Sequence, residues 1–129
     1  MNLEGKGKKT CFTQPCACFD GSHCRIYEDR PKRCRTFECR LLQRAQQDSA
    51  SVPGALRKIA VARRRAEAVL QLVRDLGHVD ETVPLSRRYA EIMSQPDDLS
   101  GDPAQSRRRG ELLLAVHELV MVLERDFLT

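Results

Sequence analysis

The sequence predicts a mostly α-helical protein, in which a small cysteine-rich module is followed by a helical hairpin or three-helix bundle. All six cysteines lie between Cys11 and Cys39 of the 129-residue chain. The second half is dominated by Ala, Leu, Arg, Glu and Gln, which favour helices, whereas alternating runs of β-branched and aromatic residues are scarce. We therefore expect a cysteine-rich module at residues 1–48 and a helical region at residues 49–129 that packs on or beside it.

The module is expected to begin with a flexible basic lead-in at residues 1–10. The segment 11–39 should be rich in turns, because it contains Pro15 and the dipeptide Asp20-Gly21, which is typical of turns. Such bends would allow thiols that are distant in sequence to approach one another.

A short extended piece is expected between Cys24 and Tyr27. Pro31 disfavours helix at the residue before it but suits a first helical turn, so a helix is predicted from near Pro31 to about Gln47. The small and turn-forming residues from Asp48 to Gly54 then read as a linker.

Two long helices and a short one are predicted after the linker. Apolar residues recur at helical spacing up to Leu76, and Gly77 is placed to end that helix. The repeating residues are Leu56, Ile59, Ala60, Val69, Leu70, Val73 and Leu76. A shorter helix is expected over 85–93, before a breaker stretch at 96–103. Asp102 and Pro103 should then cap and begin a last helix that runs to about Asp126. It is predicted to bury Leu112, Leu113, Val116, Leu119, Val120 and Leu123.

Composition narrows the class of protein. No apolar stretch approaches the roughly 20 residues that span a bilayer, and the charged start lacks the apolar segment of a secretory signal. We therefore expect a cytoplasmic protein with no membrane partner. In a reducing cytoplasm, clustered thiols are more often metal ligands or redox groups than disulfides. Thiolates are soft ligands that favour zinc or iron–sulfur clusters.

The spacing of the cysteines does not match paired CxxC zinc knuckles. It reads Cys11-x4-Cys16-x-Cys18-x5-Cys24-x9-Cys34-x4-Cys39. Cys34 and Cys39 would diverge by about 140° on one regular helix, so they cannot both face one metal from a straight helix. Either the helix begins later, near Thr36, or the two thiols belong to different coordination shells.

A family resemblance emerges from the non-cysteine residues of this segment. The run from Pro15 to Leu41, PCACFDGSHCRIYEDRPKRCRTFECRL, resembles the YkgJ-like cysteine-cluster family of zinc- or iron-chelating domains. The matching residues are Pro15, Cys16, Cys24, Ile26, Tyr27, Arg30, Pro31, Cys34, Arg35 and Cys39. The resemblance implies bound zinc or iron, including an iron–sulfur cluster, held by Cys16, Cys24, Cys34 and Cys39. The upstream CxxCGxCC-like cluster usual in the family is not in this sequence, so Cys11 and Cys18 are additional candidate ligands.

The net charge of +4 lies entirely within residues 1–48. Four thiolates around a divalent cation leave a charge of about −2, which neighbouring donors must offset. Arg25, Arg35 and Arg40 are the predicted donors around the ligands. This explanation is preferred to nucleic-acid contact, because exposed aromatic platforms are not evident and Tyr27 and Phe37 are expected to pack beside the metal.

The histidines are weaker candidates. His23 adjoins Cys24, but ligands on adjacent residues are sterically awkward. His78 follows the helix-ending Gly77 and is expected to be solvated, and His117 lies beside the apolar face of the last helix. The run from Arg107 to Arg109 opposes the helix dipole; a solvated face is favoured over a patch that binds a protein partner.

The predicted function is therefore metal binding, with the biological role unassigned. The alternatives are a redox-active iron–sulfur accessory protein and a nucleic-acid-binding zinc module. An enzyme is the weakest choice, because no Ser/His/Asp constellation, P-loop or GxGxxG fingerprint is present.

Overall fold

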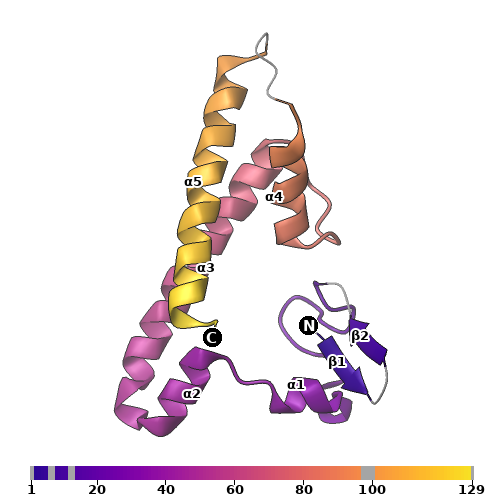
Figure 1. Cartoon of the computed structure of the whole chain (residues 1–129), viewed down its shortest axis with the longest axis vertical. Coiled ribbons are helices and arrows are strands. Elements are labelled where there is room, and N and C mark those ends of the chain that lie inside the picture. The colour runs from indigo at the N-terminus through magenta and orange to yellow at the C-terminus, as the bar shows by residue number, and fades with distance from the viewer. Residues whose placement is uncertain (1, 6–7, 12–13, 97–100, 129) are drawn as a thin grey trace. The chain divides into compact units, whose positions relative to one another are not determined.

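The computed structural model describes residues 2–5, 8–11, 14–96 and 101–128, the side chains of 2–5 and 8–11 excepted. The chain is mostly helical, as predicted (Figure 1). It divides into two compact units. The first comprises Met1–Phe37 and Asp80–Pro84, and the second comprises Glu38–Val79 and Leu85–Thr129.

The first unit begins with paired strands where a flexible lead-in was predicted, so that prediction is wrong. Strand β1 (Asn2–Gly5) pairs antiparallel with β2 (Lys8–Cys11), and Asn2 lies opposite Cys11. The backbone hydrogen bonds between the two strands give regular structure to a segment whose composition did not suggest any.

Among its other described residues, the first unit has two short helices. The 3₁₀ helix η1 (Tyr27–Asp29) replaces the end of the expected extended piece, and α1 (Lys32–Thr36) follows Pro31. The predicted continuous helix to Gln47 is therefore wrong. Phe37 is extended, with φ −69° and ψ 127°, and the chain becomes helical again only at α2 (Arg40–Gln47).

The second unit starts with α2 and a short 3₁₀ helix, η2 (Ser49–Ser51), in place of the expected linker. The carboxylate of Asp48 accepts a hydrogen bond from the Ala50 N–H at 3.0 Å, which caps η2. The α3 helix (Val52–Asp75) follows at once, because Pro53 lies in its first turn, where no N–H is needed.

The end of α3 confirms the prediction made for Gly77. This residue has φ +94°, a conformation that glycine adopts without steric cost. Its N–H donates to the Arg74 carbonyl at 2.9 Å, and the His78 N–H donates to the Val73 carbonyl at 3.1 Å. These two bonds form a Schellman motif, which satisfies carbonyls that the helix end leaves open.

Helices α4 (Leu85–Ser94) and α5 (Pro103–Asp126) also lie where the sequence predicted them. Asp102 caps α5 by accepting the Ala104 N–H at 2.9 Å. The middle of the predicted breaker stretch, residues 97–100, lies outside the described residues. No described helix carries an apolar stretch long enough to cross a bilayer.

Helices α3, α4 and α5 pack together, and α5 runs antiparallel to α3 (Figure 1). Two ion pairs are consistent with this direction. Lys58, near the start of α3, lies 3.5 Å from Asp126 at the end of α5, and Arg65 pairs with Glu118. The three helices enclose a core of Val69, Val73, Ile92, Leu112 and Leu119.

Four residues of the predicted apolar stripes are exposed, namely Leu56, Ile59, Ala60 and Leu113. Leu56, Ile59 and Leu113 are 60%, 38% and 54% exposed. The predicted burial of Leu113 is therefore wrong. Helical spacing shows that apolar residues recur, but the packing partners decide which side of the helix they cover.

Candidate functional site

Three of the predicted ligands and candidate ligands lie on one short hairpin of the first unit. The Cys16 carbonyl accepts the N–H of Phe19 at 3.0 Å, which closes a turn. Phe19 and Cys24 form an isolated antiparallel bridge. The Arg25 N–H donates to the Cys18 carbonyl at 2.8 Å. These backbone hydrogen bonds place Cys16, Cys18 and Cys24 in one small hairpin, in the turn-rich segment that the sequence predicted.

The tip of this hairpin is stabilised by Asp20. Its Oδ1 accepts the backbone N–H groups of Ser22 and His23 at 2.9 and 2.7 Å. Gly21 has φ +104°, which permits the tight turn. The hydrogen bond from the His23 N–H, followed by that from Ser22, lowers the pKa of Asp20, because both favour the charged carboxylate.

The cysteines of this segment are partly shielded from solvent. Between residues 14 and 37, only Cys16, Cys18, Cys24, Arg30 and Cys34 are partly shielded. All other side chains in that range are exposed, and none is buried. The four thiols are free rather than paired in disulfides. The segment thus shields four free thiols although it buries no apolar side chain within this range.

The break after α1 changes the geometry of the last two candidate ligands. Cys34 lies within α1, whereas Cys39 is the extended N-cap residue of α2, with φ −75° and ψ 162°. The angular conflict expected on one straight helix does not arise, because no single helix contains both residues. Cys39 belongs to the second unit and Cys34 to the first.

The predicted donors around the ligands lie in three different settings. The Arg25 guanidinium donates to the Ala17 carbonyl, so it spans the loop that carries Cys16 and Cys18. Arg35 is exposed on α1. The backbone N–H of Arg40 donates to the Phe127 carbonyl at 3.1 Å within the second unit. Of these three arginines, Arg25 alone has a side-chain hydrogen bond to the cysteine hairpin within the described residues.

Two aromatic residues differ from expectation. Tyr27 and Phe37 are 56% and 48% exposed, so neither is a packed residue beside a metal. The Arg30 guanidinium lies over the Tyr27 ring at 3.6 Å, and that of Arg33 lies over Phe37 at 5.6 Å. The sequence analysis missed these cation–π pairs, although the spacings of three and four residues are a signal for them.

The histidines take no part in a ligand cluster. His23 Nδ1 lies 2.8 Å from the hydroxyl of Ser22. His78 is not solvated as expected: its side chain is 19% exposed, and its Nε2 lies 2.7 Å from a carboxylate oxygen of Glu91. His117 is exposed on α5. Among the described side chains, no group of three or more Cys, His, Asp or Glu is arranged to hold a metal ion. The side chain of Cys11 lies outside the described set.

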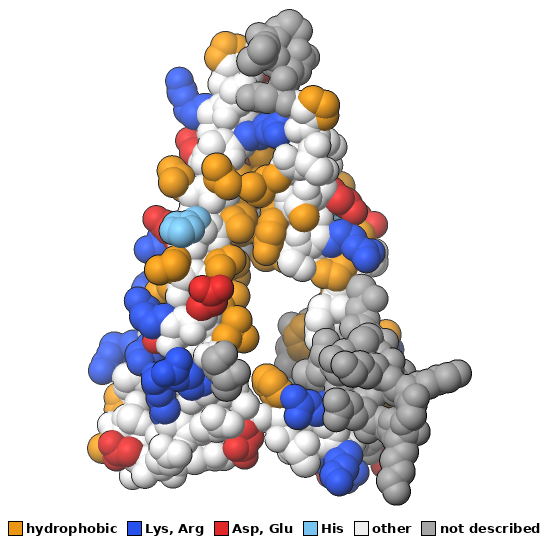
Figure 2. All heavy atoms as spheres, in the orientation of Figure 1, with side chains coloured by type: hydrophobic (Ala, Val, Ile, Leu, Met, Phe, Trp, Pro, Cys, Tyr) orange, Lys and Arg blue, Asp and Glu red, His pale blue; other side chains and the backbone are white. Residues whose placement is uncertain are grey.

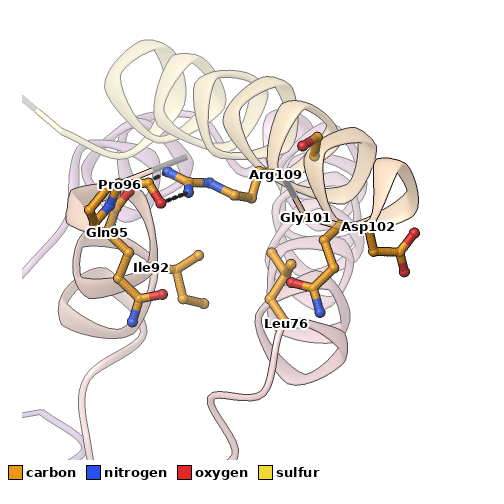
Figure 3. Close-up of a pocket in the computed structure, with 9 residues that line it drawn as sticks. Leu76, Ile92, Gln95, Pro96, Gly101, Asp102 and Arg109 are labelled. Carbon is orange, nitrogen blue, oxygen red and sulfur yellow. Dashed lines mark hydrogen bonds between the residues drawn. The ribbon is translucent and has the colours of Figure 1, made fainter. Parts of the chain in front are cut away.

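A separate cavity of about 370 Å³ opens in the second unit between the ends of α3 and α4 and the start of α5 (Figure 3). Arg109 reaches across one side of it and donates to the carbonyls of Gln95 and Pro96 at 2.7 and 3.2 Å. Gln95 and Pro96 follow directly after α4, so the hydrogen bonds of Arg109 connect the segment that leaves this helix to α5. Arg109 thus has a structural role, in place of the solvated one that its sequence run suggested.

Comparison with known proteins yields no relative: no family model matches the chain, and no curated protein or solved structure was found to match it.

Proposed function

We propose that the cysteine segment binds zinc or iron through thiolate ligands. One observation carries this proposal. Over residues 14–37 the chain buries no apolar side chain, yet it shields four free cysteines. A segment this small cannot fold stably on apolar burial alone, and metals or disulfides are the usual substitutes. The free state of the thiols favours a metal.

Within the first unit, the residue pattern and the shielding agree on Cys16, Cys24 and Cys34 as ligands. Cys18 is shielded to a similar degree on the same hairpin and is the candidate for a fourth position within the first unit. The sequence pattern predicts Cys39 as a further ligand, and Cys11 is an additional candidate. The donor chemistry fits zinc or iron, because thiolates bind these ions in preference to hard cations.

Arg25 is the cation best placed to support such a site. Its backbone N–H and its guanidinium both donate to the loop that carries Cys16 and Cys18. A positive charge held there would offset the excess negative charge of a thiolate site. We assign the protein to a reducing, cytoplasmic compartment on the same grounds, because free clustered thiols persist there.

Elemental analysis combined with an absorption spectrum tests the proposal on full-length protein purified without oxygen. We expect about one zinc or iron per chain, or broad absorption near ~400 nm if an iron–sulfur cluster is bound. The double variant Cys24→Ser/Cys34→Ser should lose the metal. Ala17→Ser, an exposed change on the same hairpin, is the control and should retain it. Metal-free wild-type protein, or an unchanged metal content in the double variant, would refute the proposal.

Spectroscopy of the metal-loaded protein also separates the redox alternative. Reversible bleaching of the visible absorption by dithionite would favour an iron–sulfur accessory protein. A colourless protein containing zinc would exclude it, since zinc has no redox chemistry.

Binding of single-stranded nucleic acid is a second candidate function, favoured by one structural observation. Phe19, Tyr27 and Phe37 are all about half-exposed, in a segment rich in Lys and Arg. Exposed rings beside cations are the elements on which unpaired bases stack. The sequence analysis disfavoured nucleic-acid binding because exposed aromatic side chains were not evident. The exposure of these three rings removes that objection.

Fluorescence anisotropy with a labelled single-stranded oligonucleotide tests this candidate. The affinity should fall steeply with salt concentration, and Tyr27→Ala/Phe37→Ala should weaken binding by about tenfold or more. Leu56→Ala, which removes an exposed apolar side chain from α3, is the control. Undetectable binding at low salt would exclude the candidate.

A further inference from the structure

Another cavity of the second unit lies where α2, η2 and the first turns of α3 meet. Its volume is about 280 Å³, and every residue that lines it belongs to the second unit. The lining residues are Leu41, Arg44, Ala50, Ser51, Pro53, Gly54, Ala55, Arg57 and Lys58. Five of these described residues have no polar side-chain atom, three are cations, and none is acidic. A mostly apolar lining with a few charged groups is typical of sites that bind small molecules.

Two of the three cations are available to an anion. The side chains of Arg44 and Arg57 are exposed, and neither guanidinium forms an ion pair or a hydrogen bond with any described residue. Each can therefore turn its planar fork of N–H groups toward a ligand without breaking a contact. This fork matches the oxygens of a phosphate or a carboxylate, to which it donates two parallel hydrogen bonds.

Lys58 supplies a third positive charge, which is only partly neutralised. Its ammonium lies 3.5 Å from a carboxylate oxygen of Asp126, and its side chain is 43% exposed. The same carboxylate accepts two hydrogen bonds from the Arg125 guanidinium, at 2.7 and 3.2 Å. One negative charge thus balances two cations, which leaves Lys58 able to contact a further anion. Figure 2 shows Lys and Arg side chains at the surface around the start of α3 and the end of α5.

The start of α3 adds to the positive potential of the cavity. Ser51 is the N-cap residue of this 24-residue helix, and its side chain makes no capping hydrogen bond. The N-terminal end of a helix carries a partial positive charge, which favours a nearby anion. Asp48 does not line the cavity, and its carboxylate accepts the N–H of Ala50 at the start of η2. The cations around the cavity therefore outnumber the carboxylates that could offset them.

We propose that this cavity binds a small organic phosphate, with the phosphate held by Arg44, Arg57 and Lys58 and the organic group against Leu41 and Pro53. A phosphate monoester carries a charge of about −1.5 to −2 near pH 7. Several cations balance this charge better than the single charge of a carboxylate or a phosphodiester. At about 280 Å³ the cavity is slightly smaller than the roughly 300–1,000 Å³ usual for ligand sites, so a compact organic group fits it best.

Isothermal titration calorimetry of the full chain with phenyl phosphate tests the proposal. We expect one saturable site per chain with a dissociation constant below about 1 mM. Arg44→Gln and Arg57→Gln should each raise that constant by about tenfold or more, because each removes charge-assisted hydrogen bonds. Arg64→Gln, which removes the same charge from an exposed residue of α3 outside the cavity, is the control and should leave the constant nearly unchanged. Circular dichroism should show that all three variants retain the helical content of the wild type.

Two related probes identify the chemical class of the ligand. Inorganic phosphate lacks the organic group, and methyl phenyl phosphate keeps the ring but is a phosphodiester with a single charge. Both should bind more weakly than phenyl phosphate. Tighter binding of the diester would indicate a nucleic-acid backbone and would overturn the proposal, and equally tight binding of inorganic phosphate would overturn the contact with an organic group. No binding of phenyl phosphate, or equal losses of affinity in Arg64→Gln and Arg57→Gln, would refute the site itself.

Discussion

Replacing Leu112 by alanine should destabilise the helical unit strongly. Leu112 is 0% exposed and belongs to the core that α3, α4 and α5 enclose. The change removes three carbon atoms, which corresponds to about 2.4 kcal/mol at roughly 0.8 kcal/mol per buried methylene. The cavity left behind adds to this, so we expect a loss of about 3 to 4 kcal/mol. A loss of that size is a large part of the total stability of a small domain.

Urea unfolding followed by circular dichroism at 222 nm measures this loss. Leu56→Ala is the matched control, because the same atoms are removed from a side chain that is 60% exposed. It should change stability by less than about 0.5 kcal/mol. Equal effects of the two substitutions, or a loss below about 1 kcal/mol for Leu112→Ala, would show that the helices do not pack around Leu112 as described.

Three further predictions concern the ends of the long helices. The pKa of Asp126 is lowered, chiefly by its hydrogen bond from Arg125 and further by the charges of Arg125 and Lys58. The stability from Asp126 is therefore present above its unfolded pKa of about 3.9 and is lost as pH falls through the lower folded value. Acid titration of unfolding should show this loss below about pH 4, and Asp126→Asn should reduce it. Gly77→Ala should lower stability by about 1 kcal/mol, because φ there is +94°. Gly54→Ala should raise it by up to ~1 kcal/mol in thermal melts, because the new Cβ meets only an ordinary contact at 3.7 Å. Opposite signs would contradict these backbone assignments.

Local chemistry in the sequence was sufficient to predict where α3 ends and where α5 begins. Gly77 and the Asp102-Pro103 pair act within a few residues of their own position, so tertiary contacts are not needed to interpret them. The same holds for the Asp20-Gly21 turn, which closes through hydrogen bonds to the next residues. The clustering of cysteines predicted the segment that holds the candidate site, and the shielding of its thiols was found only in the structure.

Long-range contacts decided what the local pattern left open. Arg88 is 3% exposed and donates to the His78 carbonyl at 2.6 Å, yet nothing in its neighbourhood distinguishes it from the exposed Arg87 beside it. Arg109 differs from its arginine neighbours because Gln95 and Pro96, just after α4, supply carbonyls within its reach. Such roles depend on elements that are distant in sequence, so they cannot be predicted from the residues on either side of the arginine.

Helix α5 shows most clearly which properties the sequence determines and which the tertiary packing decides. Its sequence determined that it is a helix with apolar residues on more than one side, because spacing and propensity are properties of the chain itself. Only the packing of α3 and α4 decided that Leu112 is enclosed and Leu113 is not. Burial is a property of which surfaces meet, and the free energy of removing apolar surface from water is gained only where a second surface is present.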